Sequence, residues 1–255
     1  MPIFRYLKRK WLLSQPLPNS RLRILENRVS YYKRLPADLK STLQDRVKIF
    51  MNEKLFEGCN GLKMTEEKKV ILSAYACVLL LGEPSDYYAD LQSILVYPDD
   101  YRAPVHEEDE AGVITTGTEA RKGEFWNVGS IVISWKDLEN NIRSKAGNRN
   151  IIFHEFSHQL DEQYGLSAGV DERGEVHRDD EWSHIMAKTL KQLRKKVRRG
   201  IPGVLDPYGA EHPVELFAVA TEAFFLKPAK LKKEYPEFYD GLQIFYNINP
   251  SDFIK

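Results

Sequence analysis

Cysteine is scarce in this sequence, and its scarcity argues against two classes of protein. The 255 residues contain two cysteines, Cys59 and Cys77, which form no C-x-x-C pair. Neither a disulfide framework nor a zinc site built from cysteines is therefore expected. We interpret both as buried thiols in a reducing compartment, which predicts a cytoplasmic location.

Long apolar runs and an excess of one charge are also absent. The longest apolar run, residues 71–81, is too short to span a bilayer, and the N-terminus has no pattern of a secretory signal. Lys plus Arg and Asp plus Glu number 37 each, so the net charge is zero and direct nucleic-acid binding is not expected. The hydrophobic share of 42% and the charged share of 29% are those of an ordinary globular protein.

Positive charge is nevertheless concentrated at one end of the chain. Residues 1–34 carry nine Lys or Arg and one Glu, a net charge of 9 − 1 = +8. Phe4, Leu7 and Trp11 recur among them at helical spacing. One interpretation is a membrane-surface helix. We favour a solvated basic arm that docks a few aromatic residues on the body, since runs of charge usually face solvent.

The pattern H-E-x-x-H in residues 151–161 predicts a metal site. Residues four apart lie one turn above each other on a helix, so His154 and His158 can bind one ion, with Glu155 beside them as a base. Zn²⁺ favours such nitrogen ligands, and we expect one ion per chain. A surface helix can carry this pattern by chance, but three apolar residues lead directly into it and predict a buried helix, where polar side chains need partners.

A catalytic zinc site needs a third protein ligand, and a downstream carboxylate is the expected one. Glu215 and Glu222 lie seven apart within the apolar segment 213–225, which predicts a buried helix. One of them should bind the metal, and the other should hydrogen-bond a ligand or the metal helix; the alternative is that both pair with basic residues. Asp161, on the ligand face, is a further candidate for a hydrogen bond to a ligand imidazole. The full set of candidate carboxylates is Glu175, Asp179, Asp180, Glu181, Glu211, Glu215 and Glu222.

Periodicity predicts an α+β fold, mostly helical, with a small β-sheet beside the H-E-x-x-H helix. The metal helix should begin near Asn148 or Asn150 and end by Gly165. The segment 130–135 is expected to be an edge strand that binds the substrate backbone by β-pairing. We expect three parts: the arm 1–34, a helical part 35–98 and a catalytic part 99–255, the last two forming one compact unit. The other predicted elements are helices over 36–56, 70–81 (capped by Thr65), 182–197 and 213–225, a strand over 93–97, and a surface connection over 166–181.

Several segments together resemble a known family. "GEFWNVGSIVISW", "HEFSHQLD", "HPVELFAVATEAFF" and the spacing of Tyr208 from Glu215 are similar to the Mlc titration factor A family, and more distantly to the catalytic domain of anthrax lethal factor. The resemblance covers most of residues 35–240. It implies a zincin-like fold, the zinc ligands His154, His158 and Glu215, the catalytic carboxylate Glu155 and an active-site hydroxyl on Tyr208. It also implies cytosolic aminopeptidase-type activity and a possible partner, the transcriptional repressor Mlc.

The function expected from these residues is zinc-dependent hydrolysis of short peptides by a monomer. Glu155 should take a proton from the attacking water, and Tyr208, in a glycine-flanked loop whose backbone can move, should stabilise the oxyanion. His177, His184 or His212 could assist, and the sequence does not choose between them, whereas His106 is expected at the surface. The rival hypothesis is a metal-stabilised protein that sequesters a regulator.

Overall fold

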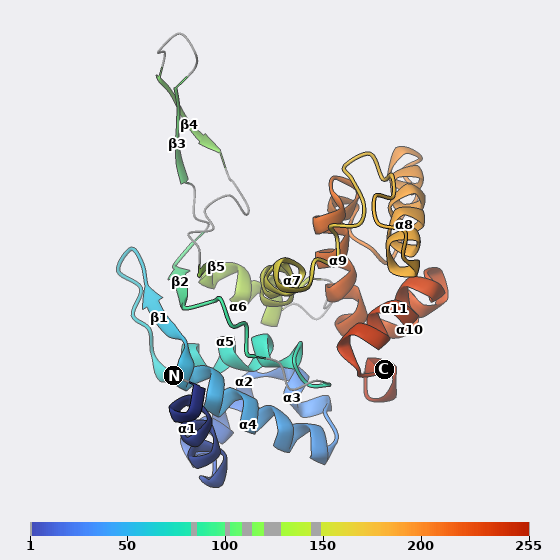
Figure 1. Cartoon of the computed structure of the whole chain (residues 1–255). Helices are drawn as coiled ribbons and strands as arrows, with labels where there is room; N and C mark the ends of the chain where they lie inside the picture. Colours follow the sequence, from blue (N-terminus) through green and yellow to red (C-terminus); the bar gives the residue numbers. More distant parts are fainter. Residues whose placement is uncertain are drawn as a thin grey trace.

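The computed structural model describes residues 2–82, 86–99, 103–108, 114–119, 129–143 and 149–254. It is an α+β structure dominated by helices (Figure 1). The helices are α1 (Pro2–Ser14), α2 (Asn19–Arg28), α3 (Ser30–Arg34), α4 (Ala37–Glu53), α5 (Glu66–Val78), α6 (Trp135–Arg143), α7 (Ile151–Tyr164), α8 (Glu181–Arg198), α9 (Pro213–Leu226), α10 (Pro228–Glu234) and α11 (Pro236–Tyr246), with 3₁₀ turns η1 (Pro207–Ala210) and η2 (Pro250–Asp252).

Three strands form a small parallel sheet in the order β1 (Leu55–Gly58), β2 (Ser93–Tyr97) and β5 (Ser130–Ser134). Leu55 lies beside Ser93, and Ser93 lies beside Ser130. A separate antiparallel pair, β3 (Ala103–Glu108) and β4 (Ile114–Glu119), makes up a second sheet (Figure 1).

Three predicted boundaries are wrong. The helix expected over 70–81 spans Glu66–Val78, so it ends three residues early. The helix expected over 36–56 ends at Glu53, and the chain then enters β1. Lys54 is extended there, and its buried ammonium group donates to the backbone carbonyls of Tyr88 and Leu91, so a contact distant in sequence ends the helix. The strand expected over 130–135 stops at Ser134, and Trp135 begins α6.

The predicted caps of the helices are confirmed. The Thr65 hydroxyl accepts a hydrogen bond from the backbone N–H of Lys68 at 3.3 Å. The Asn150 side chain accepts from the N–H groups of Ile152 and Phe153, which fixes the start of α7. Gly165 ends α7 with a φ of +62°, a left-handed conformation that favours glycine. Asn148, the other candidate cap, lies outside the described residues.

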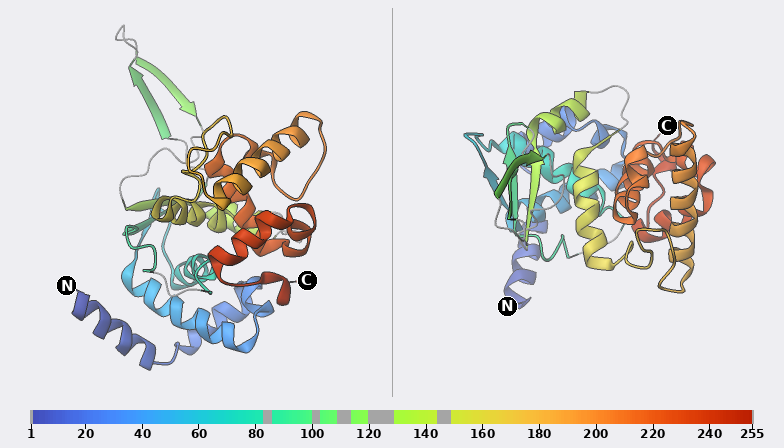
Figure 2. Two further views of the ribbon diagram at one scale, coloured as in Figure 1. Left: turned by 45° about the vertical axis from the view of Figure 1, so that its right-hand side comes forward. Right: turned by 90° about the horizontal axis from the view of Figure 1, so that it is seen from above.

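Helix α7 runs through the middle of the molecule, between the N-terminal helices with the sheet and the C-terminal helices (Figure 2). Phe153 and Phe156 on its buried face are fully enclosed. The Phe153 ring lies 5.8 Å from that of Tyr31 and 5.5 Å from that of Phe225. One hydrophobic cluster extends from Leu17 to Ile254 and includes residues of both 35–98 and 99–255. The helix with the metal motif is therefore fixed from both sides.

The N-terminal segment differs from the predicted arm. Residues 2–14 form α1, whose Arg5 and Arg9 bind Glu53 of α4, while Phe4 and Trp11 are 72% and 61% exposed. The prediction that aromatic residues dock on the body is wrong for α1, because the guanidinium groups make the contact with α4 instead. The aromatic residues of this segment that do dock on the body are Tyr31 and Tyr32 of α3, which are buried. The rest of the segment packs into the core through buried side chains of α2 and α3, such as Leu25. None of the described helices is long and apolar enough to cross a membrane.

Candidate metal centre

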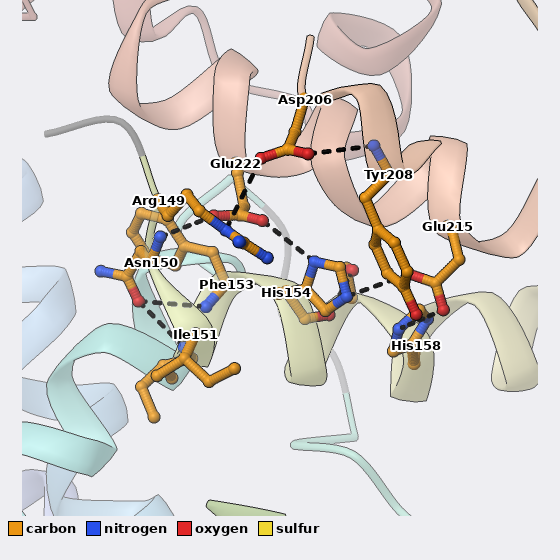
Figure 3. A network of polar contacts seen from close by, with 12 residues as sticks. Arg149, Asn150, Ile151, Phe153, His154, His158, Asp206, Tyr208, Glu215 and Glu222 are labelled. Carbon is orange, nitrogen blue, oxygen red and sulfur yellow. Dashed lines mark hydrogen bonds and ion pairs between the residues drawn. The ribbon is translucent and has the colours of Figure 1, made fainter. Parts of the chain in front are cut away.

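Helices α7 and α9 bring His154, His158 and Glu215 together (Figure 3). One ligand atom from each lies within 4.8 Å of the other two. His154 Nε2 is 3.1 Å from Glu215 Oε2, and His158 Nε2 is 3.8 Å from Glu215 Oε1. The two imidazole rings are perpendicular, with centroids 4.9 Å apart. All three side chains are at least largely buried.

These three residues fit a single transition-metal ion. Two imidazole nitrogens and one carboxylate oxygen form a donor set that zinc uses in catalytic sites, with a fourth position left for water or substrate. Ligand bonds of about 2.0–2.1 Å in tetrahedral geometry place the donor atoms roughly 3.3 Å apart. The observed separations of 3.1 and 3.8 Å, which end on different oxygens of the Glu215 carboxylate, are of the same order. The three side chains therefore offer their donor atoms to one cation.

The pKa values of the two histidines are also consistent with a metal site. Burial lowers the pKa of His154, but its contacts with Glu215 and Glu222 outweigh this and raise the pKa to about 10. Burial and the neighbouring His154 lower the pKa of His158 to about 4. The carboxylates thus hold one positive charge on His154 in the absence of metal. A bound metal ion would replace that proton, as is general for ligands that must be deprotonated.

Glu222 holds the start of α7 and the ring of His154 in place. Its Oε1 lies 2.9 Å from His154 Nδ1, and its Oε2 accepts a hydrogen bond of 2.6 Å from the backbone N–H of Asn150. When Nδ1 carries the proton and donates to Glu222, Nε2 faces Glu215 and is available to a metal. Of the two carboxylates of α9, Glu215 therefore lies among the candidate ligands. Glu222 contacts Nδ1 of His154, on the side of the ring away from Glu215.

Asp161 does not make the contact predicted for it. Its carboxylate accepts hydrogen bonds from the backbone N–H and the hydroxyl of Ser167, and so holds the loop that follows α7. Asp161 lies seven residues past His154, about 10 Å along the helix at 1.5 Å per residue. Its side chain turns toward the C-terminal end of the helix, and the hydrogen bond to a ligand imidazole is made by Glu222.

Tyr208 is presented to the cluster by η1. Its hydroxyl points toward Glu215 and His158 in Figure 3, and its ring centroid is 6.0 Å from that of His154. Burial, followed by the negative charge of Glu215, raises the pKa of Tyr208 to about 12, so the hydroxyl keeps its proton at neutral pH. The side chain is therefore available as a hydrogen-bond donor.

The turn that carries Tyr208 is packed, and not loose as the sequence suggested. Asp206 accepts a hydrogen bond of 3.0 Å from the backbone N–H of Tyr208. Gly209 is buried against α9, where a Cβ atom would lie 2.4 Å from Val219 Cγ2. Gly209 is thus needed for close approach rather than for movement. Sequence reasoning missed the role of Asp206, although an aspartate two residues before the tyrosine is a recognised turn signal.

Glu155 follows His154 on α7 and is half-buried. The pKa of Tyr208 is raised first by burial and then by the charges of Glu215 and Glu211, and the carboxylate of Glu155 raises it further. Glu155 therefore lies within electrostatic range of the hydroxyl. The motif residue expected to act as a base is close to the residue expected to act as a donor.

The other candidate carboxylates are outside this cluster and are engaged elsewhere or exposed. They are Glu175, 3.0 Å from Lys191; Asp179, 2.7 Å from His184; Asp180, which caps α8; and the exposed Glu181 and Glu211.

The histidines considered as helpers have carboxylate neighbours away from the cluster. His177 is 3.5 Å from Asp171, and His184 is exposed beside Asp179. His212 caps α9 by accepting a hydrogen bond from a backbone N–H. The side chain of His106, on β3, lies outside the described residues. Among the hydroxyl and imidazole groups considered for stabilising the oxyanion, Tyr208 is therefore the one that the described structure places beside the three candidate ligands.

Comparison with known proteins gives concordant matches. A family model described as glucose-regulated metallo-peptidase M90 matches residues 4–247. An uncharacterized protein of Synechocystis sp. is 33% identical over 244 residues, covering 95% of this chain and 89% of that protein. Mlc titration factor A of Yersinia pestis and that of Yersinia pseudotuberculosis are each 24% identical over 202 residues, covering 78% of this chain and 74% of theirs.

Proposed function

The chain belongs to the glucose-regulated metallo-peptidase M90 family, and we propose that it is a zinc-dependent peptidase with aminopeptidase-type activity on short peptide or aminoacyl substrates. One observation carries the proposal: His154, His158 and Glu215 offer three donor atoms within 4.8 Å of one another. Glu155 follows the first ligand on α7, as hydrolysis requires. One zinc ion per chain is the stoichiometry that this donor set supports.

Each residue around the cluster has a distinct task in this proposal. Zinc, when bound, would lower the pKa of a coordinated water from 15.7 to about 7. Glu155 accepts the proton of the attacking water and passes it to the leaving amine. The Tyr208 hydroxyl donates a hydrogen bond to the oxyanion that develops on the substrate carbonyl, an interaction whose loss typically costs about 10²–10³-fold in kcat. Glu222 keeps His154 oriented and makes no contact with substrate.

Strand β5 is the proposed binding site for the substrate backbone. It pairs with β2 on one side, and no other described strand pairs with its second edge. Helix α7, which carries two of the candidate metal ligands, packs against β5. An extended peptide that adds to such an edge gains main-chain hydrogen bonds. This arrangement supports a preference for extended, unstructured peptides.

Metal content and activity test the proposal together. Purified protein should contain one zinc per chain and hydrolyse members of a panel of aminoacyl and short peptide substrates. Glu155→Gln should keep the zinc and lose hydrolysis, because the amide cannot accept the proton. A protein without a stoichiometric transition metal that also takes none up on titration would exclude the proposed site.

A second candidate function is the sequestration of a transcriptional repressor. The names of the two Yersinia relatives, Mlc titration factor A, favour it. In this case hydrolysis would be secondary and the metal would stabilise a binding surface. Glu155→Gln separates the two candidates: a peptidase loses its biological function, whereas a sequestering protein retains repressor binding.

A further inference from the structure

Helix α1 is attached to the body by its charged side chains. Arg9 binds both carboxylate oxygens of Glu53, at 2.6 and 2.8 Å, and Arg5 reaches the same carboxylate at 2.8 Å. Burial alone would raise the pKa of Glu53, but these hydrogen bonds lower it to about 2, so the carboxylate stays charged. The guanidinium of Arg9 also lies 4.7 Å from the centre of the Tyr87 ring. These contacts fix which face of α1 is turned inward.

The outward face of α1 is apolar, the reverse of an ordinary surface helix. Ile3, Phe4, Leu7 and Trp11 are 74%, 72%, 56% and 61% exposed. At 100° per residue these four positions form one continuous stripe along the helix. Of the eleven large hydrophobic side chains that are exposed in the described part of the chain, six lie on α1, so the exposure is concentrated there. Single exposed apolar residues need no explanation, but a stripe of this kind indicates a binding surface.

Positive charge borders the stripe. Lys8 and Lys10 lie roughly 80° to either side of its centre on the helix. Neither forms an ion pair with the described residues, in contrast to Arg5 and Arg9, whose charges are matched by Glu53. Leu55 of β1, 59% exposed, lines the same surface hollow as Phe4 and Lys8 and extends the apolar surface toward the sheet. The surface therefore combines aromatic and aliphatic side chains with two uncompensated lysines.

We propose that α1 is a membrane-surface helix that lies flat on an anionic lipid bilayer. The apolar stripe would enter the boundary between headgroups and acyl chains, and Lys8 and Lys10 would meet lipid phosphates. A second copy of the chain fits this surface poorly. Stable protein interfaces bury about 800 Å² on each partner from roughly 20–30 residues, far more than this stripe offers. A symmetric pair would also bring lysines of the same charge together. This proposal does not depend on the peptidase activity.

Co-sedimentation of the full chain with vesicles tests the proposal. The protein should bind vesicles that contain phosphatidylserine, bind phosphatidylcholine vesicles weakly, and be released by salt. Leu7→Glu combined with Trp11→Glu should weaken binding at least about tenfold, because two apolar contacts are replaced by charges that the lipid repels. Lys8→Ala and Lys10→Ala should each weaken binding about fivefold.

Ile244→Glu is the matched control, since Ile244 is 82% exposed on α11, away from α1 in sequence. It should bind vesicles as the unsubstituted protein does, and all variants should keep the melting temperature, because the changed side chains are exposed. Equal binding by the Leu7/Trp11 variant, or equal binding to neutral vesicles, would overturn the proposal. So would a dimer in sedimentation velocity that only this variant abolishes, because the stripe would then be an interface between copies.

Discussion

At the scale of single residues, His154 is the centre of the site, because it lies between two carboxylates with different tasks. Glu215 approaches its Nε2, where a metal would bind, and Glu222 approaches its Nδ1 from the opposite side of the ring. The sequence places both glutamates on one face of a buried helix but does not distinguish them. The distances to the two ring nitrogens do.

Substitution of the two glutamates should separate these tasks. Glu215→Ala removes a donor atom and should reduce zinc affinity most. Glu222→Ala leaves all three donors and should reduce affinity by about 10–100-fold, as expected when a side chain that orients a ligand is lost. Competition with a chromophoric chelator measures both affinities. Weaker zinc binding by the Glu222 variant than by the Glu215 variant would show that the assignment is reversed.

Tyr208→Phe tests whether the hydroxyl acts on the reaction. The phenyl ring keeps the packing of η1 against α9, while the donor is removed. We expect kcat and kcat/KM to fall together by about 10²–10³-fold, because the hydrogen bond forms only in the transition state. Zinc content and melting temperature should be unchanged. Wild-type kcat with full zinc would instead mean that Tyr208 only covers the metal ligands.

At the scale of elements, the contact between α1 and α4 has a defined pH dependence. The pKa of Glu53 is about 2 in the folded protein and near its ordinary value of 4.5 when unfolded, so its contribution to stability is complete above about pH 5. It is lost as the pH falls from 4.5 toward 2, because the unfolded state then binds the proton more readily.

Denaturation of the Glu53→Gln variant measures this contribution. The difference in free energy of unfolding between the unsubstituted protein and the variant should be constant above about pH 5 and should shrink as the pH falls toward 2. Glu26→Gln, at an exposed carboxylate of α2, is the control and should show a smaller difference. A Glu53 difference that does not change with pH would mean that the ion pairs to Arg5 and Arg9 are absent in solution.

At the scale of the whole molecule, the candidate metal site lies where the two halves of the structure meet. Helix α7 contacts α5 and the sheet on one side and α9 on the other, and the candidate ligands lie where α7 meets α9. A metal ion at this position would cross-link two helices that are distant in sequence. Metal binding and global stability should therefore be coupled.

Removal of the metal should lower the melting temperature. Zinc present at 1,000 times its dissociation constant adds about 4 kcal/mol to stability, which corresponds to roughly 8–16 °C for a domain of this size. Differential scanning calorimetry of the zinc-loaded and chelator-treated protein measures the shift. His158→Ala should melt at the temperature of the chelated protein and respond little to added zinc. Identical melting temperatures with and without metal would argue against the cross-link.

Local patterns in the sequence were sufficient for the metal motif and for helices α5, α7, α8 and α9, but they did not predict α2, α3, α6, α10 or α11. Thr65, Asn150 and Gly165 act at helix ends through contacts within a few residues, so their effects can be predicted from neighbours in the chain. His154 and His158 share a face of α7 because of helical periodicity alone. The choice of Glu215 among the downstream carboxylates came from the resemblance to a known family, since spacing left Glu222 as an equal candidate.

Tertiary structure decided everything that depends on contacts between distant segments. Lys54 ends α4 because carbonyl groups more than thirty residues away accept its buried ammonium hydrogen bonds. Asp161 turns to Ser167, and Glu222 reaches His154 across 68 positions of sequence. The orientation of α1 has the same cause. Its periodicity predicts an apolar and a basic side. The carboxylate of Glu53, 44 residues beyond Arg9, binds the basic side and so turns it toward the body. Periodicity determines which side chains share a face, whereas the partner that packs against the helix determines which face is exposed.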